Sequence, residues 1–134
     1  MKPEWLNRDI MVLGGYYTLC TTEKQFRREL KRLKVQDRLK FLHSPTADAS
    51  VHCLTNENGK ACWIVCLGDV KKQHPVEVEG LLIHEAVHIW QEHCHAISQR
   101  SPSDEEEAYA IQRIAQSLLH EYRRQTKKGK KQCR

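Results

Sequence analysis

The sequence predicts an α+β fold in which a small antiparallel sheet packs against two long helices. Two apolar, β-prone segments at 50–54 and 61–67 flank a polar turn and predict a β-hairpin. Two stretches with helical spacing follow, one beginning near Pro75 and the other after Pro102. The 134 residues, of which 40% are hydrophobic, suffice for one domain with a modest core.

A strand and a helix are expected before the hairpin. The segment 16–20 is aromatic and β-prone, which predicts the strand. Thr22 and Gln25 form a capping-box pattern, which predicts that a helix begins there and runs to about Lys34. The outer face of this helix is basic, and its inner face is expected to carry Phe26, Leu30 and Leu33.

The strand expected at 61–67 is apolar on both faces, which indicates that it is covered on both sides or lies beside a groove. The next helix is expected from Val76 to about Ile97, since Pro75 suits a first turn and no other proline follows in this stretch. Apolar residues surround the axis of this helix, as is typical of a buried central helix.

A second capping pattern, Ser103 followed by Glu106, predicts that the last helix begins just after Pro102. The core face of this helix is expected to carry Ala108, Ile111, Ala115, Leu118, Leu119 and Tyr122. We expect residues 1–126 to form a single domain and residues 127–134 to form a basic, disordered tail.

The sequence contains no apolar run of about 18 residues, and its first residues lack the apolar stretch of a signal peptide. A cytoplasmic location without a membrane partner is therefore expected. The six cysteines are then expected to be reduced core residues, because disulfides are rare in the cytosol.

The segment His84-Glu85-Ala86-Val87-His88 has the H-E-x-x-H pattern and falls within a predicted helix. Histidines four residues apart lie on one helix face, so both imidazoles can bind one tetrahedral ion. Zinc lowers the pKa of a water and polarises a substrate carbonyl, while a neighbouring carboxylate serves as general base. The motif predicts zinc as cofactor, His84 and His88 as ligands, and Glu85 as the catalytic base.

The acidic run 104–107 at the start of the last helix can supply a third ligand. At 100° per residue, Asp104 and Glu107 fall nearest the apolar stripe. Glu105 lies at the flank of the stripe, and Glu106 points to solvent. A ligand that lines a cleft belongs at the flank, so this geometry permits Glu105 without selecting it. Alternatively, these acids only favour the positive end of a helix.

An H-E-x-x-H helix followed by a helix with Glu-x-x-Ala resembles the glutamate zincins, or gluzincins. It is especially similar to short metallopeptidases proposed in bacteriophages and other mobile elements. The resemblance is specific over residues 76–116. It implies a minimal zincin-like domain, Glu105 as third zinc ligand, and hydrolysis of a protein or peptide substrate in the host cytoplasm. Where many gluzincins carry an acid after the alanine, this chain has Tyr109, a candidate catalytic hydrogen-bond donor to an oxyanion.

The same resemblance implies that a strand beside the active-site helix binds the substrate, and 63–67 is the candidate. Another zincin class has its third ligand in H-E-x-x-H-x-x-G-x-x-H. Gln91 and Cys94 stand at its Gly and last His positions, so that pattern fails. His93 and His95 are expected to be exposed or outer-site residues, because the helix carries them away from the ion.

Two alternatives stay open. The chain could be a non-catalytic phage module, structural or protein-binding, in which zinc serves as a staple. The formal charge of +5 is concentrated at 24–40 and in the tail, which also permits binding to nucleic acid. Nucleic acid ranks last as a partner, because such clusters are commonly solvated surfaces and frayed ends. The oligomeric state is left open.

Overall fold

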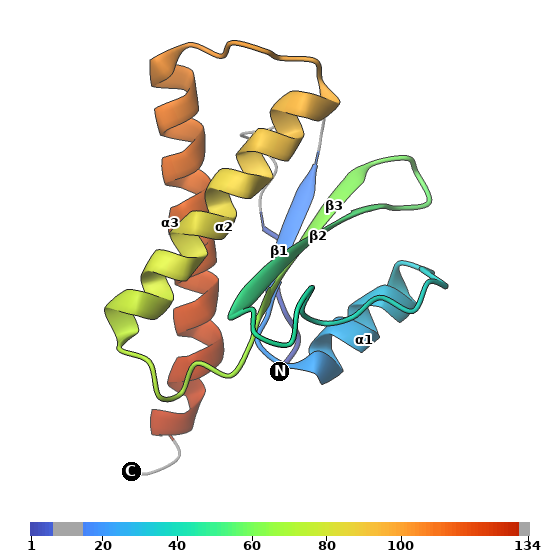
Figure 1. Cartoon of the computed structure of the whole chain (residues 1–134). Helices are drawn as coiled ribbons and strands as arrows, with labels where there is room; N and C mark the ends of the chain where they lie inside the picture. The colour runs from blue at the N-terminus through green and yellow to red at the C-terminus, as the bar shows by residue number, and fades with distance from the viewer. Residues whose placement is uncertain (7–14, 132–134) are drawn as a thin grey trace.

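A computed structural model describes the backbone of residues 1–6 and 15–131 and the side chains as far as Lys127. It confirms an α+β fold with three helices and three strands in this part of the chain (Figure 1). In chain order the elements are β1 (Tyr16–Cys20), α1 (Glu23–Arg32), β2 (Ala49–Thr55), β3 (Ala61–Leu67), α2 (Pro75–Ala96) and α3 (Asp104–Lys131).

The sheet has the strand order β1-β3-β2. The predicted hairpin is confirmed, because β2 and β3 pair in antiparallel orientation with Val51 opposite Val65. The expectation of a purely antiparallel sheet is wrong, since β1 pairs in parallel with β3 and Tyr17 lies opposite Trp63. Parallel pairing requires a crossover, and α1 with the connection that follows it supplies that crossover.

Strand β3 is the central strand of the sheet and is covered on both faces. This confirms the first of the two explanations offered for its apolar sequence. Trp63 and Val65 belong to the core formed with α2 and α3. Ile64 and Cys66 belong to a second core formed with α1. Because β3 is paired along both edges, the expectation that 63–67 binds an added peptide strand is wrong. The sheet edge in contact with α2 is β2.

Helix α1 begins at the predicted capping box. The Thr22 hydroxyl accepts a hydrogen bond from the backbone N–H of Gln25, and the Gln25 side chain accepts from the backbone N–H of Thr22 in return. The helix ends at Arg32, slightly before the expected Lys34, which has a left-handed φ of 59°. Phe26 and Leu30 are buried as expected, and Leu33 packs against their cluster.

Helices α2 and α3 run antiparallel on one side of the sheet, while α1 lies on the other (Figure 1). Pro75 occupies the first turn of α2, as predicted. The Ser103 hydroxyl accepts a hydrogen bond from the backbone N–H of Glu106 at the start of α3, 3.3 Å away. Farther along, Arg123 and Glu79 form an ion pair at 2.7 Å that joins the two helices.

The buried face of α3 is rotated slightly from the predicted one. Leu118 and Ala115 are buried as expected, but Ala108 is exposed. Ile114 and Glu121 are fully buried instead. The difference arises because α3 packs against both α2 and β1, which turns its buried face toward Ala110, Ile114 and Glu121 and leaves Ala108 outside it.

Helix α3 continues to Lys131, so the backbone of residues 127–131 in the expected tail is helical. Residues 132–134 lie outside the described residues. No helix in the described part of the chain combines the length and the apolar character needed to cross a membrane.

Candidate metal centre

His84 and His88 lie on the exposed side of α2 with their imidazoles turned toward each other. Their Nε2 atoms are 3.0 Å apart. Two ligand nitrogens at 2.0–2.1 Å from one tetrahedral zinc ion are about 3.3 Å apart, so the observed separation needs little adjustment. The donor type and the spacing of this pair therefore fit two positions of a zinc shell.

Glu85 lies between the two histidines in sequence but points inward. Its side chain is only 6% exposed. This burial raises the pKa of its carboxyl above the usual value, and the positive charges of His84, His88 and His43 partly oppose the rise. A pocket of about 490 Å³ lies beside it and is lined by both His84 and Glu85. The carboxylate thus lies at the inner wall of a solvent-accessible space next to the histidine pair.

The start of β2 forms the opposite wall of this pocket. Ala47, Asp48 and Ala49 line it together with residues from the first turns of α2. Since β2 is the sheet edge that contacts α2, His84 lies along a cleft between a helix and an edge strand.

Gln91 supports the histidine pair, a role that sequence reasoning missed. Its Oε1 lies 3.3 Å from Nδ1 of His88. A hydrogen bond from Nδ1–H to this amide oxygen leaves Nε2 of His88 free as the metal-binding atom. The sequence did contain a signal for this contact: Gln91 follows His88 by three residues, and residues at that spacing are neighbours on a helix.

The structure does not bring a third ligand to the pair. Among the described residues, no group of three or more His, Cys, Asp or Glu side chains is close enough to hold a metal ion. Glu105 is exposed at the start of α3. Its role as third ligand stays a prediction.

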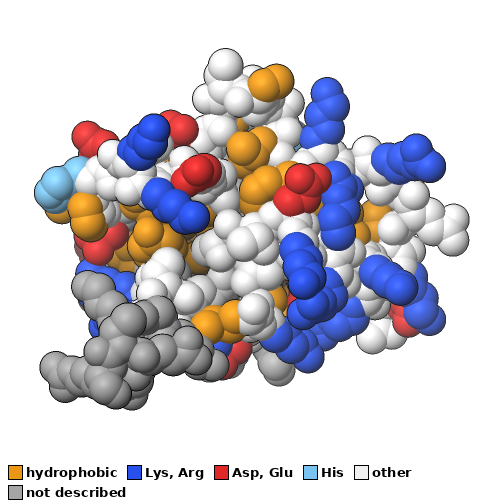
Figure 2. Space-filling model, turned by 90° about the horizontal axis from the view of Figure 1, so that it is seen from below, with side chains coloured by type: hydrophobic (Ala, Val, Ile, Leu, Met, Phe, Trp, Pro, Cys, Tyr) orange, Lys and Arg blue, Asp and Glu red, His pale blue; other side chains and the backbone are white. Residues whose placement is uncertain are grey.

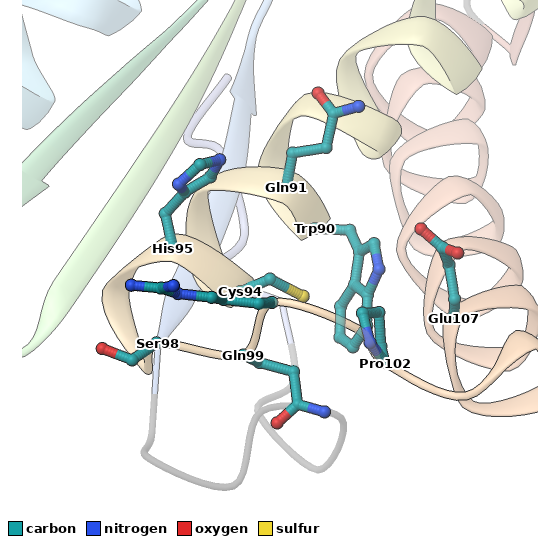
Figure 3. A pocket seen from close by; sticks show the side chains of 9 residues that line it. Trp90, Gln91, Cys94, His95, Ser98, Gln99, Pro102 and Glu107 are labelled. Carbon is teal, nitrogen blue, oxygen red and sulfur yellow. The ribbon is translucent and has the colours of Figure 1, made fainter.

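Of the acidic residues at the start of α3, Glu107 has the closest link to the histidine pair. It lines a pocket of about 570 Å³ between the end of α2 and the start of α3, together with Gln91. Figure 3 shows Glu107 projecting from α3 on one side of this pocket and Trp90 on α2, with the Gln91 side chain pointing away from Trp90 and Pro102. Trp90 is 3% exposed, and its indole N–H has no partner among the described residues. Through Gln91 this pocket adjoins His88.

The remaining candidates lie apart from the pair. Tyr109 is 62% exposed on α3, and its catalytic role stays a prediction. His95 is exposed as expected, but His93 is 4% exposed, so that expectation is wrong. His93 is buried because it packs between Trp63 and Trp90, and its burial lowers its pKa. Apolar residues surround the axis of α2 in the sequence, and this pattern was the signal that a histidine of this helix could be buried.

Five of the six cysteines fall in the described residues and none of them forms a disulfide: Cys20, Cys53, Cys62, Cys66 and Cys94. Four are buried, and Cys53 is exposed on β2. Cys133 lies outside the described residues.

No protein-family model, curated protein or solved structure matches this chain.

Proposed function

We propose that this chain is a gluzincin-like zinc peptidase in which His84 and His88 hold the ion and Glu85 is the general base. The observation that carries the proposal is the 3.0 Å approach of the two Nε2 atoms beside a buried carboxylate. Without a metal, one Nε2–H can donate a hydrogen bond to the other Nε2 at this distance. With both nitrogens deprotonated, the same geometry directs two lone pairs at one ion, and the buried carboxylate beside them adds the base that a peptidase needs. When bound, zinc supplies a Lewis acid that acidifies a water and polarises a carbonyl.

Glu85 is suited to proton transfer by its position. Its carboxylate lines the same pocket as His84, so it can accept a proton from a water that attacks a substrate carbonyl there. The same group can then deliver that proton to the leaving amine. Gln91 contacts His88 and not Glu85, so the support of the ligand and the proton transfer are assigned to different side chains.

The shape of the site favours an extended peptide as substrate. The pocket beside His84 is bounded by the start of β2, an edge strand. Backbone groups at a sheet edge bind extended chains by adding a strand. In place of the strand proposed from sequence, β2 is therefore the strand that we assign to substrate binding.

Hydrolysis should depend on Glu85 while metal binding should not. We expect Glu85→Gln, reconstituted with zinc, to retain about one zinc per chain and to lose cleavage of a peptide library monitored by mass spectrometry. Glu79→Gln is the matched control, because Glu79 is on the same helix but pairs with Arg123, and it should cleave as wild type does. Full cleavage by Glu85→Gln would rule out the mechanism.

The third ligand can be found by metal analysis. We propose Glu105 from the resemblance and keep Glu107 as the alternative that faces α2. Zinc content should fall in Glu105→Gln and stay unchanged in Glu106→Gln. A loss confined to Glu107→Gln would assign the ligand to Glu107 instead. Tyr109→Phe should retain zinc and slow cleavage if its hydroxyl reaches the oxyanion.

The alternative function is a zinc-stapled phage module without catalysis. Its two histidines are on an exposed face of a helix whose core packs without them, which favours a catalytic site over a staple. The two functions predict different effects of His84→Ala on folding. We expect this variant to keep its fold, measured by circular dichroism, whereas a staple requires that it unfold.

A further inference from the structure

The surface opposite the histidine pair is strongly basic. Eight Lys and Arg side chains, all exposed, fall between residues 24 and 40: Lys24, Arg27, Arg28, Lys31, Arg32, Lys34, Arg38 and Lys40. They belong to α1 and the connection after it, on the face of the sheet away from α2 and α3. Figure 2 shows Lys and Arg side chains crowded over the side of the molecule where α1 lies, with few acidic side chains among them.

Few of these charges are neutralised. Arg27, Arg32 and Lys34 pair with Glu23, Glu29 and Glu57. The other five form no ion pair within the described residues.

Three of the unpaired cations lie in one row along α1. Lys24, Arg28 and Lys31 are spaced four and three residues apart, which places them within about 60° of each other over about 10 Å of helix. Arg27 donates a hydrogen bond to the carbonyl of Leu39 at 2.6 Å, so the connection that carries the remaining cations lies against α1.

Tertiary structure brings the end of α3 beside the start of α1. Gln125 of α3 accepts hydrogen bonds from Thr21 at 2.9 Å and from Gln25 at 3.1 Å. The end of α3 is therefore beside the first turn of α1. Lys127, two residues after Gln125, is exposed there, and the helical backbone continues through the lysine-rich segment 128–131. Lys127 thus adds a cation near the first turn of α1, about 100 residues away in sequence.

We propose that this basic surface binds the phosphate backbone of double-stranded DNA. Protein partners require an apolar centre in the contact. The exposed large apolar residues of the described chain are Met1, Val76, Ile83 and Tyr109, none of which is on α1. Single strands require exposed aromatic side chains for stacking, which are missing from α1 for the same reason. Duplex RNA differs from DNA in its 2′-hydroxyls and groove shape, so an RNA duplex serves as a competitor in the test.

Binding should depend strongly on salt. Each phosphate contact contributes about −0.9 to the slope of log K against log salt concentration. We expect a mixed-sequence DNA duplex, labelled for fluorescence anisotropy, to bind with a Kd of about 10⁻⁴ to 10⁻⁶ M at physiological salt. The triple variant Lys24→Gln, Arg28→Gln, Lys31→Gln should bind about ten-fold more weakly or worse, and its slope should fall by about 2.7.

The matched control removes the same charge elsewhere. Lys71, Arg100 and Arg113 are exposed, form no ion pair in the described part of the chain and are neither on α1 nor in the hairpin turn that Lys34 contacts, so their triple Gln variant should bind as wild type does. A further variant, Lys24→Arg with Lys31→Arg, changes the side chains but keeps their charges. We expect it to bind DNA as wild type does, which separates loss of charge from loss of stability in the Gln variant. Equal losses in both triple variants, or unchanged binding in the α1 variant, would overturn the proposal.

Two competitors test whether the surface prefers duplex RNA or an acidic polypeptide to DNA. Tighter binding to an RNA duplex of the same sequence, or equally tight binding to poly-glutamate, would overturn the assignment to DNA. The inference is independent of the proposed peptidase, since Glu85→Gln should bind DNA with the wild-type slope.

Discussion

The Nδ1 atom of His88 lies 3.3 Å from the amide oxygen of Gln91, one turn farther along α2. When Nδ1–H donates to this oxygen, Nε2 of His88 is the nitrogen left to bind a metal. The contact also connects the histidine pair to the pocket that Gln91 shares with Glu107.

Removing this support should weaken zinc binding. We expect Gln91→Ala to lower zinc affinity by about 10- to 100-fold, because His88 loses the group that orients it. Gln91→Glu should retain affinity, since a carboxylate can accept the same hydrogen bond. Competition with a chromophoric chelator measures both. Wild-type affinity in Gln91→Ala would show that Gln91 has no positioning role.

Acid should destabilise the fold through buried histidines. His52 is 6% exposed and Nε2 lies 3.0 Å from the carbonyl of Phe41. Burial lowers its pKa below the usual value, and the charges of His43 and Arg27 add to this effect. The unfolded chain therefore binds a proton more readily than the folded chain, so stability falls as the pH decreases through about 6.5. His93, with a pKa lowered mainly by burial, contributes in the same direction.

Urea unfolding at pH 7.5 and pH 5 measures this difference. We expect the free energy of unfolding to be lower at pH 5 and the difference to shrink in His52→Gln, which does not titrate. Equal stability of the wild type at both pH values would contradict the expectation.

Glu121 should contribute to stability far more than an exposed acid. It is fully buried and accepts hydrogen bonds from the guanidinium of Arg124 and from the side chain of Gln125. We expect Glu121→Ala to reduce the free energy of unfolding by about 1 to 3 kcal/mol, because these donors lose their partner. The control Arg123→Ala removes an exposed ion pair and should cost less than about 1 kcal/mol. Similar losses in the two variants would contradict this role.

Thiol reactivity should follow burial. Burial raises the pKa of Cys20 to about 12, aided by Glu29, and it raises the pKa of Cys66 as well. Cys53 is exposed, with a pKa raised to about 11. We expect iodoacetamide to modify Cys53 first in the native protein and all three after unfolding, as seen by mass spectrometry. Failure of Cys20 and Cys66 to react after unfolding without reductant would indicate a disulfide.

Local features of the fold could be predicted because their causes are local. The Thr22 capping box, the Pro75 start of α2 and the Ser103 start of α3 each depend on groups within three residues of each other. The hairpin also depends on a short connection, and the convergence of His84 and His88 follows from helix periodicity alone.

Features that depend on distant segments could not be predicted. Whether β1 runs parallel to β3 depends on the path taken through α1, which no local pattern encodes. The burial of His93 depends on a tryptophan from β3 that packs over α2. The rotation of the core face of α3, which leaves Ala108 exposed, depends on contacts with two elements at once.

The sequence by itself therefore determined the H-E-x-x-H pair, because two residues one turn apart on a single helix need nothing else to meet. Only the tertiary structure decided what surrounds that pair: the edge strand β2 across the cleft, and Gln91 with Glu107 in one pocket. It also decided that the end of α3 lies beside the basic helix α1, through Gln125. These relations arise from packing between segments far apart in the chain, where periodicity carries no information.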